Sequence, residues 1–372
     1  MATVQRLKGF IFLAFLYYTG LFGTIVIMGP TLILLCLRPR WFRWVNDHLT
    51  VWWLVLPPTL LEMMFGVKIV VTGDKPPKSE NSVIIMNHRC RLDWMFFWSF
   101  VARYGELKHE KIIMKRELKH IPGPGWAMQN ALYIFLHRRW ERDESYLNSV
   151  LSYFVNSSDS LQLLLFPEGT NFEEASKQKS DSFATKNNLP FYDYVLHPRV
   201  RGFTYCVEKL RQGNVDAILD VTVGYSENYC FEEVDLLKGN VPSEIHFHIQ
   251  RYSNDALPQD TQGLEEWCCK QWMQKEDRLR KFYTKEKHFG PPSEIASEQQ
   301  NEIQLAVSYL FKKGLIFWLL FTICSSVLLY MSAMVRWYVL IIGIVYLTLS
   351  CFGGTDEIFL QLIQKSMDTK TK

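Results

Sequence analysis

The sequence predicts an α/β domain, built on a mixed sheet flanked by helices, between two ends that lie in a membrane. Charged residues concentrate between about residues 73 and 313, whereas both ends of the 372-residue chain are strongly apolar. Hydrophobic residues make up 48% of the chain, and a water-soluble protein has no reason to collect them at its ends. In the charged middle, short β-rich runs alternate with helical patterns, which is typical of an α/β domain.

The first apolar segment is long enough to cross a bilayer. No charged residue occurs from Gly9 to Cys36. A helix of this length extends roughly 42 Å, which exceeds the ~30 Å hydrocarbon core of a bilayer. Arg6 and Lys8 precede the run, as in a signal peptide, but the run far exceeds an apolar signal core of ~7–15 residues. We therefore expect a retained membrane anchor.

A basic connector that contains tryptophan, Leu37–Trp44, follows the anchor. It suits the headgroup layer, where aromatic rings and cations both find partners. The next apolar stretch, Val51–Leu61, contains Pro57 and Pro58 and is too short to span comfortably. It fits a re-entrant or interfacial helix. A core helix of the middle domain is the alternative, because short apolar runs are ambiguous.

The C-terminal end predicts a transmembrane hairpin. Gly314–Val335 and Trp337–Phe352 carry no charge, and Arg336 marks the turn between them. Because Lys312 and Lys313 precede the hairpin, both of its ends are expected on the cytosolic side. The chain thus divides into a membrane anchor with an interfacial helix (1–66), an α/β domain (67–300), and a hairpin with a tail (301–372). This organisation is that of a multi-pass membrane protein.

The middle domain has strand and helix candidates in alternation. The strands are expected at Val67–Val71, Val83–Met86, Lys111–Met114, Tyr133–Leu136, Leu161–Phe166, Ile218–Gly224 and Glu244–Gln250. The helices are expected at Leu92–Arg103, Glu141–Phe154, Arg201–Arg211 and Leu264–Tyr283. In the last strand, alternation is expected to turn His246 and His248 outward. Glu276 and Arg280 have the i,i+4 spacing of a solvated ion pair.

Charge and cysteine usage exclude several classes of function. The formal net charge of +3 is far below that of a general nucleic-acid binder, so we expect no nucleic-acid partner. The eight cysteines include no C-x-x-C pair, which argues against a zinc ribbon or a thioredoxin-type redox site. His246 and His248 have no carboxylate at metal-ligand spacing, so no metal is expected. The sequence gives no indication of the oligomeric state.

The first candidate for chemistry is a histidine and an aspartate directly after a predicted strand. His88 and Asp93 follow the strand that ends at Met86, and strand ends present reactive groups to a ligand cleft. Histidine has the unperturbed pKa of a general base at neutral pH. Asp93 would lie about one helical turn away and fix the imidazole tautomer. On its own this spacing is common by chance.

A second candidate is the loop Phe166–Thr170, in which a hydrophobic strand runs into Pro-Glu-Gly-Thr. Gly169 permits a tight turn with exposed amides, and Thr170 adds a hydroxyl, so the loop suits an oxyanion or a phosphate. An ordinary loop with a capping threonine is the alternative. Arg138 at another strand end suits a phosphate clamp or, equally, an exposed ion pair. Val195–Arg199 is expected as a structural loop beside the cleft.

Together these blocks resemble the glycerophospholipid acyltransferase family, which is related to the 1-acylglycerol-3-phosphate acyltransferases. The resemblance rests on the H-x4-D block (His88 to Asp93), the F-x-x-R block (Phe135 to Arg138) and the F-P-E-G-T block (Phe166 to Thr170), in that order. It extends to Glu244–His248 and to the C-terminal hairpin, and so covers most of the chain. It implies the glycerolipid acyltransferase fold.

The resemblance also implies a reaction. His88 would deprotonate the hydroxyl of a lysophospholipid, which would attack acyl-CoA directly, and Asp93 would orient His88. The substrates would be acyl-CoA, as a co-substrate with no further cofactor, and an anionic lysophospholipid such as lysocardiolipin, lysophosphatidylinositol or lysophosphatidylglycerol. The enzyme would remodel phospholipids in the endoplasmic reticulum membrane.

The same resemblance implies a set of substrate-binding residues. Glu168, Gly169 and Thr170, with Arg138, would hold the acceptor phosphate or the developing oxyanion. Arg89 and Arg91 flank the base and would attract anionic lipid or CoA; a solvated basic face is the alternative.

Two other classes of function use the same residues differently. A CoA-independent transacylase or a lipid hydrolase would use the same histidine–aspartate pair without acyl-CoA. A non-catalytic membrane scaffold would need neither His88 nor Asp93.

Overall fold

The computed structural model describes residues 2–157, 159–213, 215–227, 232–290 and 297–368. The chain forms two compact units. The first comprises Met1–Phe10, Leu61–Ile112 and Phe154–Leu305, and the second comprises Ile11–Leu60, Ile113–Tyr153 and Ala306–Lys372. The predicted segments, divided at residues 66 and 300, are continuous in sequence, whereas each compact unit combines three separate segments. The predicted division stays a prediction.

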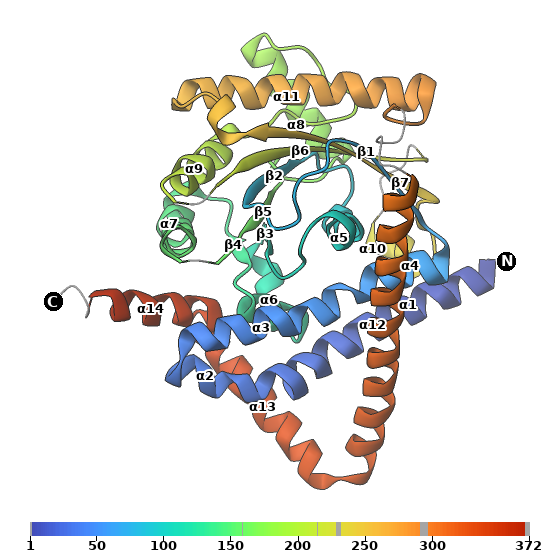
Figure 1. Ribbon diagram of the computed structural model, residues 1–372, viewed down its shortest axis with the longest axis vertical. Helices are drawn as coiled ribbons and strands as arrows, with labels where there is room; N and C mark the ends of the chain where they lie inside the picture. Colours follow the sequence, from blue (N-terminus) through green and yellow to red (C-terminus); the bar gives the residue numbers. More distant parts are fainter. Residues whose placement is uncertain (1, 158, 214, 228–231, 291–296, 369–372) are drawn as a thin grey trace. The chain divides into compact units, whose positions relative to one another are not determined.

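The first unit contains a mixed sheet in the order β1-β7-β6-β2-β5-β3 (Figure 1). Its strands are β1 (Lys68–Gly73), β2 (Ser82–Met86), β3 (Glu110–Lys115), β5 (Gln162–Leu165), β6 (Ala217–Tyr225) and β7 (Glu244–Ser253). β6 and β7 pair antiparallel, whereas the other pairs are parallel. The predicted mixed α/β sheet is thereby confirmed.

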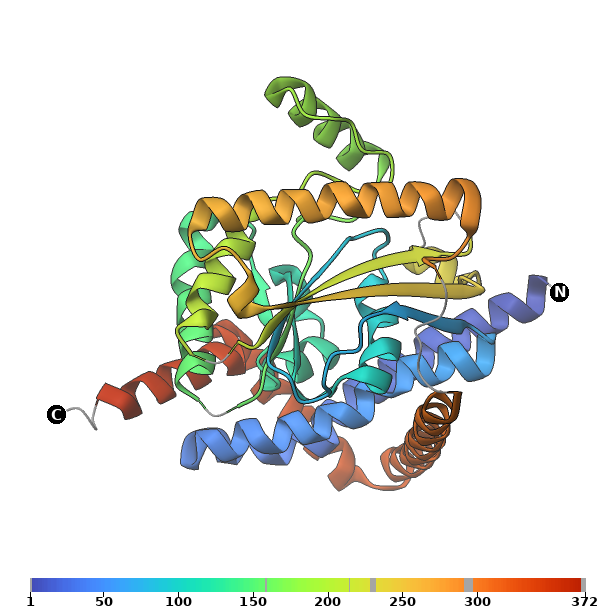
Figure 2. The ribbon, with the colours of Figure 1, turned by 45° about the horizontal axis from the view of Figure 1, so that its top comes forward.

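The central strands lie in the core and bring three loops to one edge of the sheet. Every residue of β2, β5 and β6 is buried, because helices cover both faces of the sheet. The nearly continuous apolar sequences of these strands are typical of such burial. Figure 2 shows α11 (Thr261–Lys281) along one face and α5 (Asp93–Tyr104) against the other. Because β2 runs parallel to both β5 and β6, the loops after all three strands leave from the same edge.

The expected helices are present, and the sequence missed others. The expected ones are α5, α7 (Trp140–Asn156), α9 (Val200–Arg211) and α11. α8 (Glu174–Asn187) and α10 (Glu233–Leu237) were not expected, because polar residues dominate α8 and α10 is short. Reciprocal capping bonds between Glu173 and Ser176 start α8, and Figure 2 shows this helix projecting from the sheet.

Two expectations about exposure are wrong. Glu276, expected in a solvated pair, is buried and accepts hydrogen bonds from the backbone N–H groups of Asp193 and Tyr194. His246, expected to point outward, is buried beside the ring of Phe282. The segment that contains Asp193 and Tyr194 covers Glu276, and the turn after α11, which contains Phe282, covers His246.

The linker expected at Lys285–Gln300 is only partly described. Residues 291–296, which include Pro291 and Pro292, lie outside the described residues. Before them, α11 continues into a π-helical turn, Phe282–Glu286.

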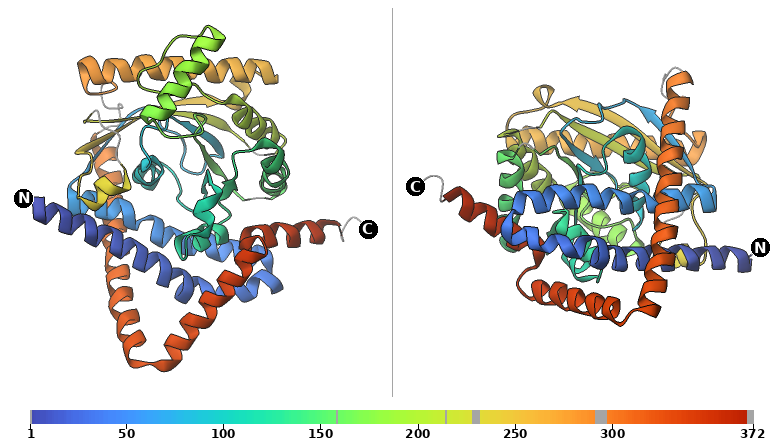
Figure 3. Two further views of the ribbon diagram at one scale, coloured as in Figure 1. Left: turned by 180° about the vertical axis from the view of Figure 1, so that it is seen from behind. Right: turned by 60° about the horizontal axis from the view of Figure 1, so that its bottom comes forward.

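Three helical stretches of the described chain are long and apolar enough to cross a bilayer: Thr3–Leu37, Asn301–Met331 and Ala333–Cys351. They confirm the apolar helices expected at the two ends. Figure 3 shows α12 (Ser297–Met331) and α13 (Ala333–Cys351) as the two arms of a hairpin. Arg336, expected at the turn, donates hydrogen bonds to the carbonyl oxygens of Leu329 and Tyr330. The cytosolic placement of the hairpin ends stays a prediction.

The remaining helices include two that lie in the N-terminal spanning stretch, α1 (Ala2–Gly23) and α2 (Leu32–Leu37). The others are α3 (Pro39–Leu54), α4 (Leu56–Phe65), α6 (Pro124–Asn130) and α14 (Gly354–Asp368). The stretch Val51–Leu61 falls within α3 and α4 and outside the three spanning stretches, so its interfacial placement stays a prediction.

In the second unit, a buried polar cluster fixes the C-terminal helix. Lys119 donates to Asp356 at 2.8 Å and to Glu357 at 2.9 Å, and the Tyr146 hydroxyl donates to Asp356 at 2.9 Å. Lys119 and Asp356 are both buried, so each charge depends on the other. The cluster ties α14 to the segment that leads into β4 (Ile134–Leu136), which pairs with the second half of β3.

A buried ion pair joins α11 to the sheet in the first unit. Asp220 in β6 and Lys275 in α11 form an ion pair, and both side chains are fully buried. The Lys275 ammonium also donates to the carbonyl oxygen of Val221. Burial lowers the pKa of Lys275, whereas the neighbouring Asp220 carboxylate raises it. The ammonium charge in the core therefore depends on the ion pair.

We expect the Asp220→Ala variant to be less stable by about 3–5 kcal/mol, because removal of one partner leaves an uncompensated buried charge. The apparent melting temperature of the purified protein in detergent measures this loss. The double variant Asp220→Leu/Lys275→Met should recover most of it. Asp181→Ala, which breaks the partly exposed pair with Lys177 on α8, is the control and should change little. Equal losses in Asp220→Ala and the double variant would contradict a role for the charge.

Candidate active site

The loop after β2 places His88 at the sheet edge. The side-chain amide of Asn87 donates to the carbonyl oxygen of Val223 at 3.1 Å, and the Val223 N–H donates to the Asn87 amide oxygen at 2.8 Å. Asn87 thereby continues the β2–β6 pairing by one residue through its side chain. This fixes the start of the loop, so the position of His88 follows from the rigid sheet.

His88 and Asp93 form the expected pair. The Nδ1 atom of His88 lies 2.9 Å from Oδ2 of Asp93. Asp93 is the first residue of α5 and is fully buried, whereas 14% of the His88 side chain is exposed. A carboxylate bonded to Nδ1 selects the tautomer in which Nε2 is free to accept a proton. Within the described part of the chain, the Nε2 atom makes no hydrogen bond.

The other oxygen of Asp93 has partners that the sequence did not reveal. The Tyr225 hydroxyl and the Cys90 thiol, at 3.1 Å, both donate to Oδ1, and the Cys90 N–H donates to Oδ2 at 3.0 Å. Burial and the charge of Asp93 raise the pKa values of Cys90 and Tyr225. Both therefore remain protonated donors, and the Cys90 thiol is unsuited to act as a nucleophile.

The Pro-Glu-Gly-Thr loop wraps around His88. The ring of Phe166 stacks on the imidazole of His88 at a centroid distance of 4.2 Å, and the Phe172 N–H donates to the His88 carbonyl oxygen at 2.8 Å. The expected block and the expected base are thus neighbours in the same unit, as their positions at the ends of β2 and β5 require.

Glu168 is turned into the fold. Its carboxyl group accepts hydrogen bonds from the backbone N–H groups of His88 (3.2 Å) and Leu196 (3.3 Å) and from the Trp272 indole (3.2 Å). Only 2% of the residue is exposed, and burial raises the pKa of Glu168 to about 8. Glu168 thereby connects the base, the segment before α9 and α11, and its expected role in binding the substrate stays a prediction.

Gly169 and Thr170 form the outer part of the loop. Gly169 has a φ of +73°, which favours glycine. Thr170 is half-buried, and its hydroxyl makes no hydrogen bond with the rest of the described chain. The Gly169 N–H, expected to be exposed, donates to the carbonyl oxygen of Phe166 at 2.9 Å, and the role of both residues in binding stays a prediction.

The two arginines beside the base have different surroundings. Arg89 is buried. Its guanidinium lies 4.6 Å from the ring centre of Tyr283 and 5.2 Å from that of Phe172, and it donates to the Tyr194 carbonyl oxygen at 3.1 Å. Arg91 is half exposed and lies 3.5 Å from Glu233. Arg89 therefore joins three segments around the site, and Arg91 lies in a surface ion pair.

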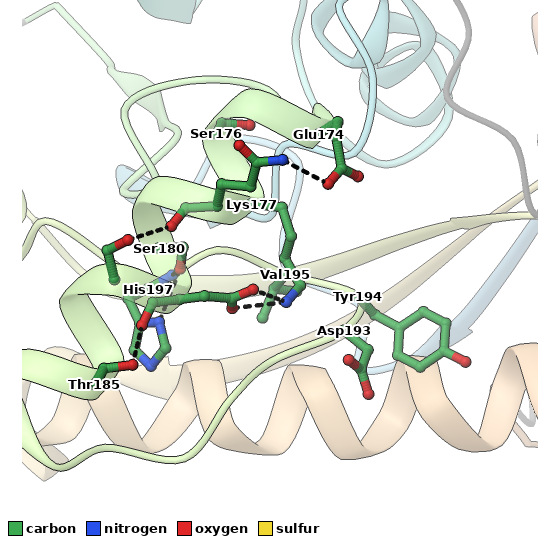
Figure 4. Close-up of polar contacts among 12 residues, drawn as sticks. Glu174, Ser176, Lys177, Ser180, Thr185, Asp193, Tyr194, Val195 and His197 are labelled. Atoms are coloured by element: carbon green, nitrogen blue, oxygen red, sulfur yellow. Dashed lines mark hydrogen bonds and ion pairs between the residues drawn. The ribbon is translucent and has the colours of Figure 1, made fainter.

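Hydrogen bonds hold the segment that runs from α8 back to α9, and Figure 4 shows Ser180 and His197 within it. The Ser180 hydroxyl lies 2.8 Å from Nδ1 of His197 and accepts the His197 N–H at 3.0 Å. The ring of Tyr192 stacks on His197. Val195 and Tyr194 donate their N–H groups to Glu276 of α11. This expected structural loop thus has a fixed course along the first unit.

Arg138 lies in the second unit, whereas His88 lies in the first, so the surroundings of Arg138 are described separately. It has a φ of +62°. The loop around it is held by Asp143, which accepts hydrogen bonds from the N–H groups of His137 (2.8 Å) and Arg139 (2.9 Å). Its role as a phosphate clamp stays a prediction.

The fold and the site define an α/β enzyme with membrane-spanning ends and a histidine–aspartate pair at the edge of its sheet. Residues 68–226 match the family model described as Acyltransferase, and residues 235–311 match the model described as Acyltransferase C-terminus. The chain belongs to this acyltransferase family. The resemblance noted in the sequence is thereby confirmed, and the chain is an acyltransferase.

Curated relatives support the same assignment. The chain is 46% identical to lysocardiolipin acyltransferase 1 of Mus musculus over 94% of each chain, and 45% identical to that of Gallus gallus over 98% of each. It is 38% identical to lysophosphatidylinositol acyltransferase 10 of Caenorhabditis elegans, over 76% of this chain and 73% of the relative. The crystal structure of the 1-acyl-sn-glycerophosphate acyltransferase PlsC from Thermotoga maritima aligns with a TM-score of 0.46 and 16% identity, over 77% of this chain and 99% of that chain.

We expect Tyr225→Phe to lower kcat by about tenfold, the effect of losing one hydrogen bond to a charged group. The lost donor weakens the negative charge of Asp93. Without this donor Asp93 should stabilise the imidazolium of His88 more strongly, so the acidic limb of the pH–rate profile should also move to higher pH. Acyl transfer assayed across pH 5–9 measures both effects. Tyr252→Phe, which removes a hydroxyl bonded to Gln271, is the matched control. An unchanged profile in Tyr225→Phe would show that the hydroxyl does not act on the pair.

We expect Glu168→Gln to change stability in a pH-dependent way. The folded-state pKa of Glu168 is raised to about 8, so the native state binds a proton that the unfolded state releases above its ordinary pKa of ~4.3. This contribution to stability is therefore lost as pH rises from about 4.3 to 8. The melting temperature of Glu168→Gln relative to wild type should rise between pH 5 and pH 8. A difference that does not vary with pH would contradict a protonated Glu168.

Proposed function

We propose that the chain transfers an acyl group from acyl-CoA to the free hydroxyl of an anionic lysophospholipid, and so remodels membrane phospholipids. The observation that carries the proposal is the His88–Asp93 pair, with Nδ1 bonded to the carboxylate at 2.9 Å and Nε2 without a partner among the described residues. A histidine in this state is a general base for a substrate hydroxyl. Membership of the acyltransferase family indicates that the group transferred is an acyl group.

The proposed reaction transfers the acyl group directly from CoA to the acceptor, through a tetrahedral oxyanion and without an acyl-enzyme. Nε2 of His88 accepts the proton of the lysophospholipid hydroxyl, and the alkoxide oxygen attacks the thioester carbonyl carbon. The carbon–sulfur bond breaks, CoA leaves as a thiolate, and the imidazolium returns the proton to the sulfur. Asp93 stabilises the imidazolium while it exists. Gly169, Thr170 and Arg138 are proposed to bind the acceptor phosphate or the oxyanion, and acyl-CoA is the only co-substrate.

The names of the relatives support a choice of acceptors. Relatives that share 46% and 45% identity over nearly the whole chain are named lysocardiolipin acyltransferases, and a more distant one is named for lysophosphatidylinositol. We therefore propose lysocardiolipin as the first acceptor to test, followed by lysophosphatidylinositol and lysophosphatidylglycerol. The spanning helices support a multi-pass membrane protein, for which we propose the endoplasmic reticulum membrane.

The test is acyl transfer from radiolabelled oleoyl-CoA to these three acceptors in microsomes that contain wild type or His88→Ala. We expect His88→Ala to lose about 10²–10⁴-fold in rate, the usual contribution of a general base. His120→Ala, which removes an exposed histidine, is the matched control and should retain activity.

Other results would redirect the proposal. Product formed without acyl-CoA would indicate a CoA-independent transacylase or a lipid hydrolase. Wild-type activity equal to that of microsomes without the protein, for every acceptor, would contradict the proposed substrates. Full activity in His88→Ala would contradict the proposed base.

A further inference from the structure

We propose that Arg199 binds the phosphate of the lysophospholipid acceptor, and thereby sets the distance between that phosphate and His88. The inference rests on the proposed function and names a residue of the same site. The sequence placed Arg199 in a structural loop and assigned the phosphate to Arg138 and to the turn that carries Gly169. Three observations support the new assignment: its contact with the Gly169 turn, the absence of an acidic partner among the described residues, and the contacts through Glu168 that its segment shares with the base.

Arg199 lies directly against the Pro-Glu-Gly-Thr turn. Its backbone N–H donates to the carbonyl oxygen of Pro167 at 2.7 Å. A Cβ atom placed on Gly169 would lie 3.2 Å from Cδ, 3.5 Å from Nε and 3.8 Å from Cζ of Arg199. The arginine side chain therefore lies over the bare backbone of the glycine, and its guanidinium is next to the turn that carries the Thr170 hydroxyl.

The same turn holds the base. Glu168, between Pro167 and Gly169, accepts the His88 N–H at 3.2 Å, and it also accepts the Leu196 N–H three residues before Arg199. The turn, the base and the segment that ends at Arg199 thus share one carboxyl group. Their relative positions are set by contacts within the first unit.

Arg199 also differs from the other arginines in its charge environment. Arg89 is buried among aromatic rings, and Arg91 is paired with Glu233. Arg199 is exposed, and its guanidinium makes no ion pair or hydrogen bond with any part of the chain that the structure describes. Glu168, the acidic residue of the turn, has its pKa raised by burial to about 8, so it remains largely uncharged at neutral pH and does not act as a counter-ion for Arg199.

The chemistry of the two substrates favours the acceptor as the source of the phosphate. In a lysophospholipid, the phosphate is separated from the reactive hydroxyl by only the glycerol carbons and an ester oxygen. In acyl-CoA, the whole pantetheine arm separates the thioester from the phosphates. A guanidinium on the turn that also holds the base is therefore placed for the acceptor phosphate, which it can bind through two parallel hydrogen bonds.

The kinetic test uses full-length protein in detergent micelles with oleoyl-CoA and lysophosphatidylglycerol. We expect Arg199→Ala to raise the KM for lysophosphatidylglycerol by about tenfold or more, as expected for loss of a charge-assisted contact. The KM for oleoyl-CoA should stay within about twofold of wild type, and Arg199→Lys should recover part of the loss because it keeps the charge but not the planar fork. Arg201→Ala, which removes another exposed arginine of the same segment, is the matched control. A rise in the KM for oleoyl-CoA instead would overturn the proposal and assign Arg199 to the CoA phosphates.

A binding test separates this proposal from the proposed function. In the His88→Ala background, binding of lysophosphatidylglycerol and of monooleoylglycerol, which lacks the phosphate, is followed by intrinsic tryptophan fluorescence. We expect Arg199→Ala to weaken binding of lysophosphatidylglycerol by about tenfold and to leave monooleoylglycerol unchanged. Equal losses for both ligands, or no loss for either, would overturn the proposal. Because this arm needs no turnover, it gives a result even if no acyl transfer is found.

Discussion

The site depends on the burial of one carboxylate, that of Asp93. A buried carboxylate is costly unless it is hydrogen-bonded, and Asp93 obtains its partners from two distant parts of the chain. His88 and Cys90 come from the loop after β2, and Tyr225 comes from the end of β6. Each partner is held by the sheet, since β2 and β6 are paired and fully buried. The orientation of His88 is therefore a consequence of core packing.

The cost of burying the Glu168 carboxyl group is offset in a different way. It has three N–H donors, but no cation is paired with it among the described residues, and burial raises its pKa. Its partners belong to the base loop, the segment before α9 and α11, so one side chain fixes the mutual positions of three segments. The two buried carboxyl groups thus have separate tasks: Asp93 orients the reacting imidazole, and Glu168 assembles the walls around it.

Much of this arrangement could be predicted from local sequence. The strands were located because apolar, β-rich runs end in turn residues, and His88, Asp93 and Gly169 were located because their spacing fits strand ends. Tyr225 could not be found in this way, since it lies 132 residues from Asp93 and only the β2–β6 pairing brings them together. α8 was missed because a polar helix that projects from the fold has little apolar periodicity.

Arg89 and Arg199 show why charge in a sequence does not identify a binding residue. Arg89 is adjacent to His88 in sequence, yet its charge is enclosed by Tyr283, Phe172 and a carbonyl oxygen. Arg199 is 111 positions away in sequence, but the shared contacts of Glu168 bring its segment to the same loop. Whether a cation can meet a phosphate depends on its exposure and on its competing partners. Both properties are set by the tertiary fold, and the Arg199 side chain lies close over the turn at Gly169, where a Cβ atom would be 3.2 Å from Cδ of Arg199.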